Sequence, residues 1–143
     1  MQSDNIPIYK KKNFEKMRKA GSLAAHVLDQ LYELIKPGTT TLEINDFCHD
    51  LILKNNAIPA PLNYKGFPKS VCTSVNHVVC HGIPNEKKSL NVGDIINVDV
   101  TVILDGWYGD SSRMFVAGKP NKKHLDLLKT TYECLQIGIK EAQ

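Results

Sequence analysis

Two aspartates, Asp99 and Asp110, lie eleven positions apart in a segment with the pattern of a tight hairpin. Two alternating runs flank Asp105-Gly106, and Asp-Gly is typical of a two-residue turn between antiparallel strands. With that turn, Thr101 lies opposite Asp110 and Asp99 opposite Ser112. The two carboxylates then share one sheet face as diagonal neighbours, roughly 7–8 Å apart at the backbone. Side chains at that reach could hold two cations about 3.5–4 Å apart, so the pattern predicts a hydrolytic metal site.

The two faces of this hairpin differ sharply in polarity. Aspartate is disfavoured in strands, and two like charges on one face repel each other unless a cation or a proton intervenes. A face of this kind is either solvated or a binding site. An aspartate near a turn need not be functional, because residues such as Asp105 are common in turns for structural reasons. We favour the metal site. The apolar face carries Ile96, Val98, Val100 and Val102, and the polar face carries Asn97, Asp99, Thr101, Asp110 and Ser112.

Length and composition are those of a single globular domain, with 143 residues and 42% hydrophobic content. No apolar run approaches the ~20 residues that a membrane helix needs, and the N-terminus lacks a signal-like segment. We therefore expect a cytoplasmic protein without a membrane partner. The four cysteines show no C-x-x-C spacing, which favours reduced thiols. A zinc site built on Cys72, Cys80 and His81 is the less favoured alternative.

The net charge of +3 is modest, but basic residues gather near the N-terminus. Such a cluster usually forms a solvated helix face. The alternative is a salt-dependent contact with the phosphate backbone of the ribosome. We expect no sequence-specific nucleic-acid binding, because interleaved aromatics and a recognisable binding motif are missing. The cluster consists of Lys10, Lys11, Lys12, Lys16, Arg18 and Lys19.

Apolar spacing predicts two helices before the first strand. The first is expected over residues 13–36, ended by Pro37-Gly38. The second begins at the capping-box pattern Thr40-x-x-Glu43 and ends near Asn55-Asn56. The following residues 59–68 are rich in proline and contain two aromatics, which indicates an ordered loop with a binding surface.

The rest of the chain is expected to alternate short strands with the acidic hairpin and a last helix. Residues 71–75 and 78–81 have the composition of short strands. Asn121 can cap the last helix, which still runs where the sequence stops. Its apolar stripe needs a covering layer, so the chain looks incomplete. The stripe consists of Leu125, Leu128, Tyr132, Leu135 and Ile139.

Three spaced motifs together resemble the type I methionine aminopeptidases. They are residues 64–72 (YKGFPKSVC), residues 79–84 (VCHGIP), and the segment from Gly93-Asp94 through Asp99 to Gly109-Asp110. The likeness begins at residue 15 and implies the pita-bread fold, an α+β architecture in which two related halves enclose a central cleft. The resemblance implies that residues 1–143 form a single domain with helices packed on an antiparallel sheet. This domain would be the N-terminal half of the catalytic domain, truncated after the first helix of the second half.

The resemblance also assigns site residues. Members of this family hold two divalent metals with two Asp, one His and two Glu, and the two Asp match Asp99 and Asp110. The remaining three ligands would lie beyond Gln143. His81 matches a catalytic histidine that contacts the substrate near the scissile bond. Tyr64, Phe67 and Cys72 match substrate-binding positions that line the pocket for the methionine side chain.

The implied activity is removal of the initiator methionine from nascent proteins, with a preference for a small second residue. Two divalent ions, for which Co, Mn, Fe and Zn are all acceptable, would polarise the scissile carbonyl and supply a hydroxide nucleophile near neutral pH. Because three ligands are missing, we expect residues 1–143 alone to be inactive. The alternative is a catalytically silent module of the same fold that binds peptides or the ribosome.

Overall fold

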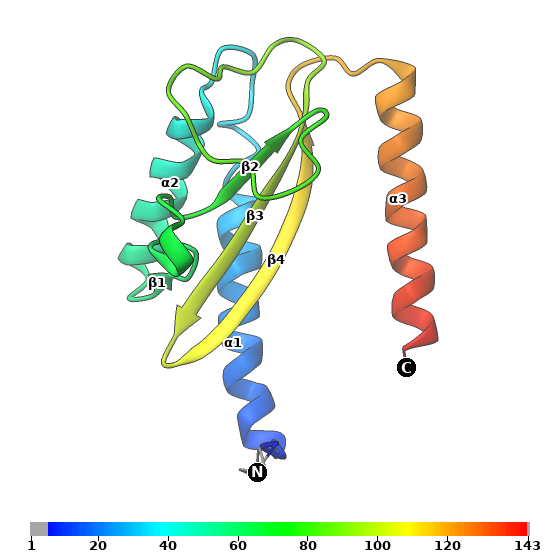
Figure 1. Ribbon diagram of the computed structural model, residues 1–143. Helices are drawn as coiled ribbons and strands as arrows, with labels where there is room; N and C mark the ends of the chain where they lie inside the picture. The colour runs from blue at the N-terminus through cyan, green and yellow to red at the C-terminus, as the bar shows by residue number, and fades with distance from the viewer. Residues whose placement is uncertain (1–5, 143) are drawn as a thin grey trace.

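Strand β3 (Ile95–Leu104) organises the sheet, because the other three strands all pair with it in antiparallel fashion. β4 (Trp107–Val116) runs along one edge, while β2 (Cys72–Val75) and β1 (Ile58–Pro59) follow each other along the other edge (Figure 1). The observed register confirms the predicted hairpin, with Thr101 opposite Asp110 and Asp99 opposite Ser112. This computed structural model describes residues 6–142.

The turn of this hairpin explains why its register could be predicted. Asp105 and Gly106 have φ values of +50° and +79°, and positive φ at both central residues is what a type I′ turn requires.

Gly109, one residue before Asp110, has a different role. A Cβ atom there would lie 2.2 Å from the carbonyl carbon of Ala20, so only glycine lets helix α1 (Lys11–Asp29) pack directly on β4.

Helices α1 and α2 (Thr41–Lys54) cover one face of the sheet, which makes the protein α+β as predicted (Figure 1). The apolar face of β3 lies beneath them, and its alternate residues from Ile96 to Val102 are completely buried. The opposite, polar face is not covered by these helices. Buried residues of this core come mainly from α1, α2 and β3: Ala24, Val27, Leu28, Ile44, Cys48, Ile52, Ile96, Val98, Val100 and Val102.

The second helix matches its prediction closely. The Thr40 hydroxyl accepts a bond from the Glu43 backbone N–H (3.1 Å), and the Glu43 carboxylate accepts one from the Thr40 N–H (2.7 Å). This reciprocal capping box satisfies backbone donors that the first helical turn leaves free. Asn55 caps the C-terminal end.

Two sequence-based predictions are wrong, one helix boundary and one short strand. The first helix ends at Asp29 rather than at residue 36, and residues 30–34 form successive turns; Leu31 and Ile35 are nevertheless buried. Residues 78–81, predicted to be a strand, have no regular structure. Asn76 and His81, with φ values of +53° and +55°, turn the chain at both ends of this segment and prevent an extended path.

Helix α3 (Lys122–Glu141) begins at the predicted cap, where the Asn121 side chain accepts a bond from the His124 N–H (2.8 Å). It stands away from the sheet and has no buried residue (Figure 1). Its predicted apolar stripe is therefore largely exposed, as for Leu135 at 57%. Within residues 6–142, no helix is both long enough and apolar enough to cross a bilayer.

Candidate metal and substrate site

A cavity of about 860 Å³ lies against the polar face of the sheet, and all six residues singled out from the sequence line it. Alternation along β3 and β4 directs Asp99, Thr101, Tyr108 and Asp110 to this face, away from the helices. A volume of this size suits a small ligand or the end of a peptide. The complete lining is Ala60, Pro61, Tyr64, Lys65, Gly66, Phe67, Pro68, Cys72, His81, Ile83, Asp99, Thr101, Tyr108 and Asp110.

The two aspartates interact with each other across the hairpin. Burial raises the pKa of Asp99 above its ordinary value, and the negative charge of Asp110 and a hydrogen bond with Asp110 raise it further. His81 partly opposes this effect. A partly buried acid beside a second acid is electrostatically unfavourable at neutral pH, and a bound cation would remove the repulsion. The donor chemistry of this pair therefore fits a hard divalent metal.

His81 reaches the cavity because its neighbour Gly82 lies directly against strand β2. The Thr73 N–H donates to the Gly82 carbonyl (2.8 Å), and the Gly82 N–H donates to the Ser74 hydroxyl (3.1 Å). A Cβ atom at position 82 would lie 2.1 Å from the Thr73 carbonyl oxygen, so no other residue allows this approach. The left-handed backbone of His81 is thus held in place by its neighbour's contacts with the sheet.

The apolar part of the cavity comes from the proline-rich segment 60–68 and from Cys72. Tyr64 is the first residue of a short 3₁₀ helix (Tyr64–Gly66), Phe67 follows its last residue, and the Phe67 N–H donates to the Tyr64 carbonyl (2.9 Å). Cys72 lies opposite Asp99 in the β2–β3 pair. Burial, assisted by the charges of Asp99, Cys80 and Asp110, raises the pKa of the Cys72 thiol to about 11. The thiol is therefore neutral and serves as a small apolar surface.

Sequence reasoning missed several lining residues. Tyr108 lies two positions before Asp110 on β4, so strand alternation was a sufficient signal for it. Thr101 was placed on the correct face but not in the site. Lys65 and Ile83 lie within the motifs of residues 64–72 and 79–84, but no local pattern indicates that their side chains line the cavity.

The zinc alternative is not supported. Among residues 6–142, no group of three or more His, Cys, Asp or Glu side chains is arranged to hold a metal ion. Cys72, Cys80 and His81 therefore do not form such a cluster, although Cys72 and His81 line the same cavity. The aspartate pair, with only two donors from this part of the chain, forms a partial ligand set.

Comparison with known proteins shows which family the chain resembles. The chain is 58% identical over 135 residues to a methionine aminopeptidase of Rickettsia prowazekii, covering 94% of this chain and 52% of that protein. It is 53% identical to methionine aminopeptidase A of Synechocystis, covering 96% and 54%. The chain therefore spans about half the length of these curated relatives.

Solved structures show the same fold. The crystal structure of the Rickettsia prowazekii methionine aminopeptidase superposes with a TM-score of 0.89 at 58% identity, over 91% of this chain and 52% of that one. A prolidase from Pyrococcus furiosus superposes with a TM-score of 0.72 at 22% identity, over 88% and 36%. The architecture is the pita-bread fold that the motifs implied. The profile of metallopeptidase family M24 matches residues 15–143, and the chain belongs to that family.

Proposed function

We propose that this chain belongs to a methionine aminopeptidase and supplies two metal ligands, Asp99 and Asp110, and the substrate-contacting His81. We further propose that residues 1–143 form the N-terminal half of a pita-bread catalytic domain. The observation that carries the proposal is the single cavity that both aspartates, His81 and an apolar wall line together. The names and high identity of the bacterial relatives support the same assignment.

The aspartates would hold two divalent cations together with further ligands from outside residues 1–143. Bound there, the cations would supply Lewis-acid polarisation of a carbonyl and activation of water. The raised pKa of Asp99 supports this assignment, because the two carboxylates are poorly compensated by their protein neighbours. Mn, Fe, Co and Zn all suit a site of carboxylate and imidazole ligands, and the physiological ion is set by geometry and supply.

The other lining residues would bind and orient the peptide. Tyr64, Phe67 and the neutral Cys72 offer an apolar surface for an unbranched thioether side chain. The imidazole N–H of His81 would donate a hydrogen bond to the substrate carbonyl oxygen as negative charge develops on it. Removing one such donor typically costs about 10²–10³ in kcat.

The second part of the proposal concerns the location and partner of the reaction. Removal of an initiator methionine takes place on chains leaving the ribosome, which implies a cytoplasmic protein. All six residues of the basic cluster are exposed, and the segment 10–19 that carries them contains one acid, Glu15. A positive surface of this kind supports a salt-dependent contact with ribosomal RNA. The rival function, a silent peptide- or ribosome-binding module, would use the same surface without turnover.

The test uses the full-length protein and the peptides Met-Ala-Ser and Met-Leu-Ser with Mn²⁺ or Co²⁺. We expect methionine release from Met-Ala-Ser, slower release from Met-Leu-Ser, and loss of activity on chelation. Asp99→Asn and Asp110→Asn should each reduce both bound metal and turnover at least about tenfold. Asp105→Asn is the matched control, because this acid lies in the same hairpin but does not line the cavity. Peptide binding without release would favour the silent module.

A further inference from the structure

The cavity wall formed by residues 60–68 is an unusual backbone segment that needs external support. Half of the residues that line the cavity belong to it. Three of its residues have positive φ: Asn63 (+66°), Lys65 (+48°) and Gly66 (+84°). Left-handed backbone is unfavourable for the two that are not glycine, so the surrounding contacts must hold the segment in this shape.

Hydrogen bonds within the segment do not fix it to the rest of the protein. In the part of the chain that the structure describes, the backbone bonds of residues 62–67 stay within residues 59–67. Examples are Asn63 N–H to the Phe67 carbonyl (2.8 Å) and Tyr64 N–H to the Pro61 carbonyl (3.0 Å). The position of this segment relative to the sheet is therefore set by contacts at its two ends. At the first end, the Ala60 N–H donates to the Thr101 carbonyl on β3 (2.9 Å).

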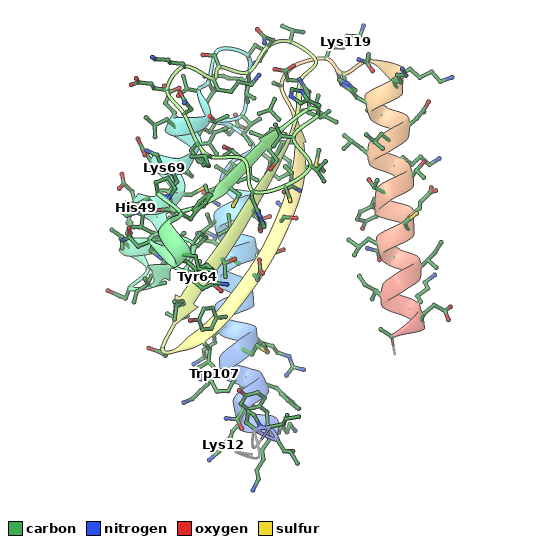
Figure 2. The ribbon with its side chains drawn as sticks, viewed as in Figure 1. Lys12, His49, Tyr64, Lys69, Trp107 and Lys119 are labelled. Atoms are coloured by element: carbon green, nitrogen blue, oxygen red, sulfur yellow. The ribbon has the colours of Figure 1, made fainter. Side chains whose placement is uncertain are left out.

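The second end is held from α2 by two side chains. The Asn45 side-chain oxygen accepts bonds from the backbone N–H groups of Ser70 (2.8 Å) and Val71 (3.4 Å). His49, one helical turn further, has its Nδ1 2.8 Å from the Ser70 hydroxyl oxygen. Figure 2 shows His49 on α2 near Lys69, which directly follows this segment, and Tyr64 further along the wall.

These contacts form a polar network whose centre is buried, while His49 is half-buried at its edge. Ser70 and Asn45 are 1% and 5% exposed, and the Asn45 amide nitrogen also donates to Asp46 (2.9 Å). Buried polar groups of this kind specify one geometry, because any displacement leaves a donor or acceptor without a partner. Neither Asn45 nor His49 lines the cavity.

We propose that Asn45 and His49 are positioning residues that set the shape of the methionine-binding wall from outside the cavity. This inference rests on the proposed function, because it assigns that wall to the substrate's first side chain. A wall that binds substrate and transition state alike affects KM, whereas residues at the reacting bond affect kcat. We call the bonds from Asn45 and His49 to residues 70 and 71 the clamp. Loss of the clamp should therefore weaken substrate binding without slowing the chemical step.

The experiment replaces His49, because removing Asn45 would leave two buried N–H groups unpaired and endanger folding. In the full-length protein, His49→Phe keeps a ring of similar size but cannot bond to Ser70. We expect KM for Met-Ala-Ser to rise about fivefold, the factor that corresponds to one ordinary hydrogen bond, while kcat stays within about twofold. His49→Asn can place a polar atom near the position of Nδ1, and it should restore KM.

Ile52→Val on the same helix is the matched control, because Ile52 is completely buried and lies outside the network. This change loosens the core with no effect on KM. Hydrogen exchange at the Phe67 and Ser70 amides gives a readout that does not require activity, and it should be about tenfold faster in His49→Phe only.

Unchanged exchange in His49→Phe would overturn the clamp. Faster exchange with unchanged KM would show that the clamped segment does not bind the substrate, which also overturns the proposal. An equal rise of KM in Ile52→Val would show that the KM change in His49→Phe comes from general destabilisation, and this result would also overturn the proposal. Absence of wild-type turnover would instead contradict the proposed function, so the two failures can be told apart.

Discussion

Replacing Gly82 with alanine is expected to displace His81 from the cavity while leaving every cavity-lining side chain chemically unchanged. The added Cβ atom would lie 2.1 Å from the Thr73 carbonyl oxygen and 2.7 Å from the Thr73 carbonyl carbon. These are backbone atoms of β2, a strand paired with β3, so they cannot swing aside as a flexible side chain would. The segment carrying His81 must move instead.

The size of the effect follows from these distances. Bringing the Cβ–oxygen contact from 2.1 Å to 3.0 Å, below which real Cβ contacts are essentially never seen, needs a displacement of roughly 0.9 Å. That movement breaks the bonds from Thr73 N–H to the Gly82 carbonyl and from Gly82 N–H to Ser74. Two lost hydrogen bonds cost about 2 kcal/mol of unfolding free energy. A displacement of about 1 Å at a reacting group reduces turnover by up to about 10²-fold.

The assay measures urea unfolding and kcat for Met-Ala-Ser in the full-length Gly82→Ala protein. Gly21→Ala is the matched control, because a Cβ atom at that helical position meets nothing within 4 Å. Alanine there should stabilise the protein by about 0.5–1 kcal/mol. If Gly82→Ala lost less than about 0.5 kcal/mol and kept its kcat, the close-contact reasoning would be refuted. A stability loss with unchanged kcat would instead remove His81 from the reaction.

Three further changes test other parts of the structure. Gly109→Ala should cost about 2–3 kcal/mol in urea unfolding, because its Cβ would lie 2.2 Å from the Ala20 backbone; a stability near that of wild type would contradict direct packing of α1 on β4. In chelated protein, the raised pKa of Asp99 makes its carboxylate bind a proton more readily in the folded than in the unfolded state, so the contribution of Asp99 to stability should increase as pH falls through that pKa toward 3.8. The lowered pKa values of Glu43 and Asp94 act in the opposite direction, so the Asp99 contribution is read as the difference between wild type and Asp99→Asn. Asp99→Asn should raise stability at pH 7 and remove the Asp99 contribution to the pH slope, and an unchanged slope would disprove the assignment. Thr73→Val should raise stability by about 1 kcal/mol, because the buried Thr73 hydroxyl has no hydrogen-bond partner among residues 6–142; destabilisation would refute this reasoning.

The acidic hairpin was predictable because its determinants are local. A two-residue turn fixes the register, and strand alternation then fixes which side chains share a face. The same rules placed Asp99, Asp110 and the apolar face of β3 correctly before any tertiary contact was known. The role of the two aspartates as metal ligands stays a prediction, because the register shows that their side chains lie close together but not that a metal binds between them.

The two wrong predictions concern segments in which side-chain burial does not reveal the backbone conformation. Apolar spacing continues to Ile35, but the helix ends at Asp29, because residues in successive turns can still direct Leu31 and Ile35 into the core. Periodicity reports burial and not hydrogen bonding, so it overestimates the helix. The loss of the expected strand at 78–81 has a different cause, the left-handed residues Asn76 and His81, whose conformation composition does not reveal.

The cavity itself depends on contacts that the sequence does not display. Its acids come from a local hairpin, but its histidine and apolar wall are brought to the hairpin by the Gly82–β2 approach and by the α2 contacts with Ser70. None of the residues that make these contacts lines the cavity itself. Because a site works only within a few tenths of an ångström, such residues should influence activity in addition to the lining side chains. Substitutions at Gly82 and His49 separate this positional contribution from the chemistry of Asp99, Asp110 and His81.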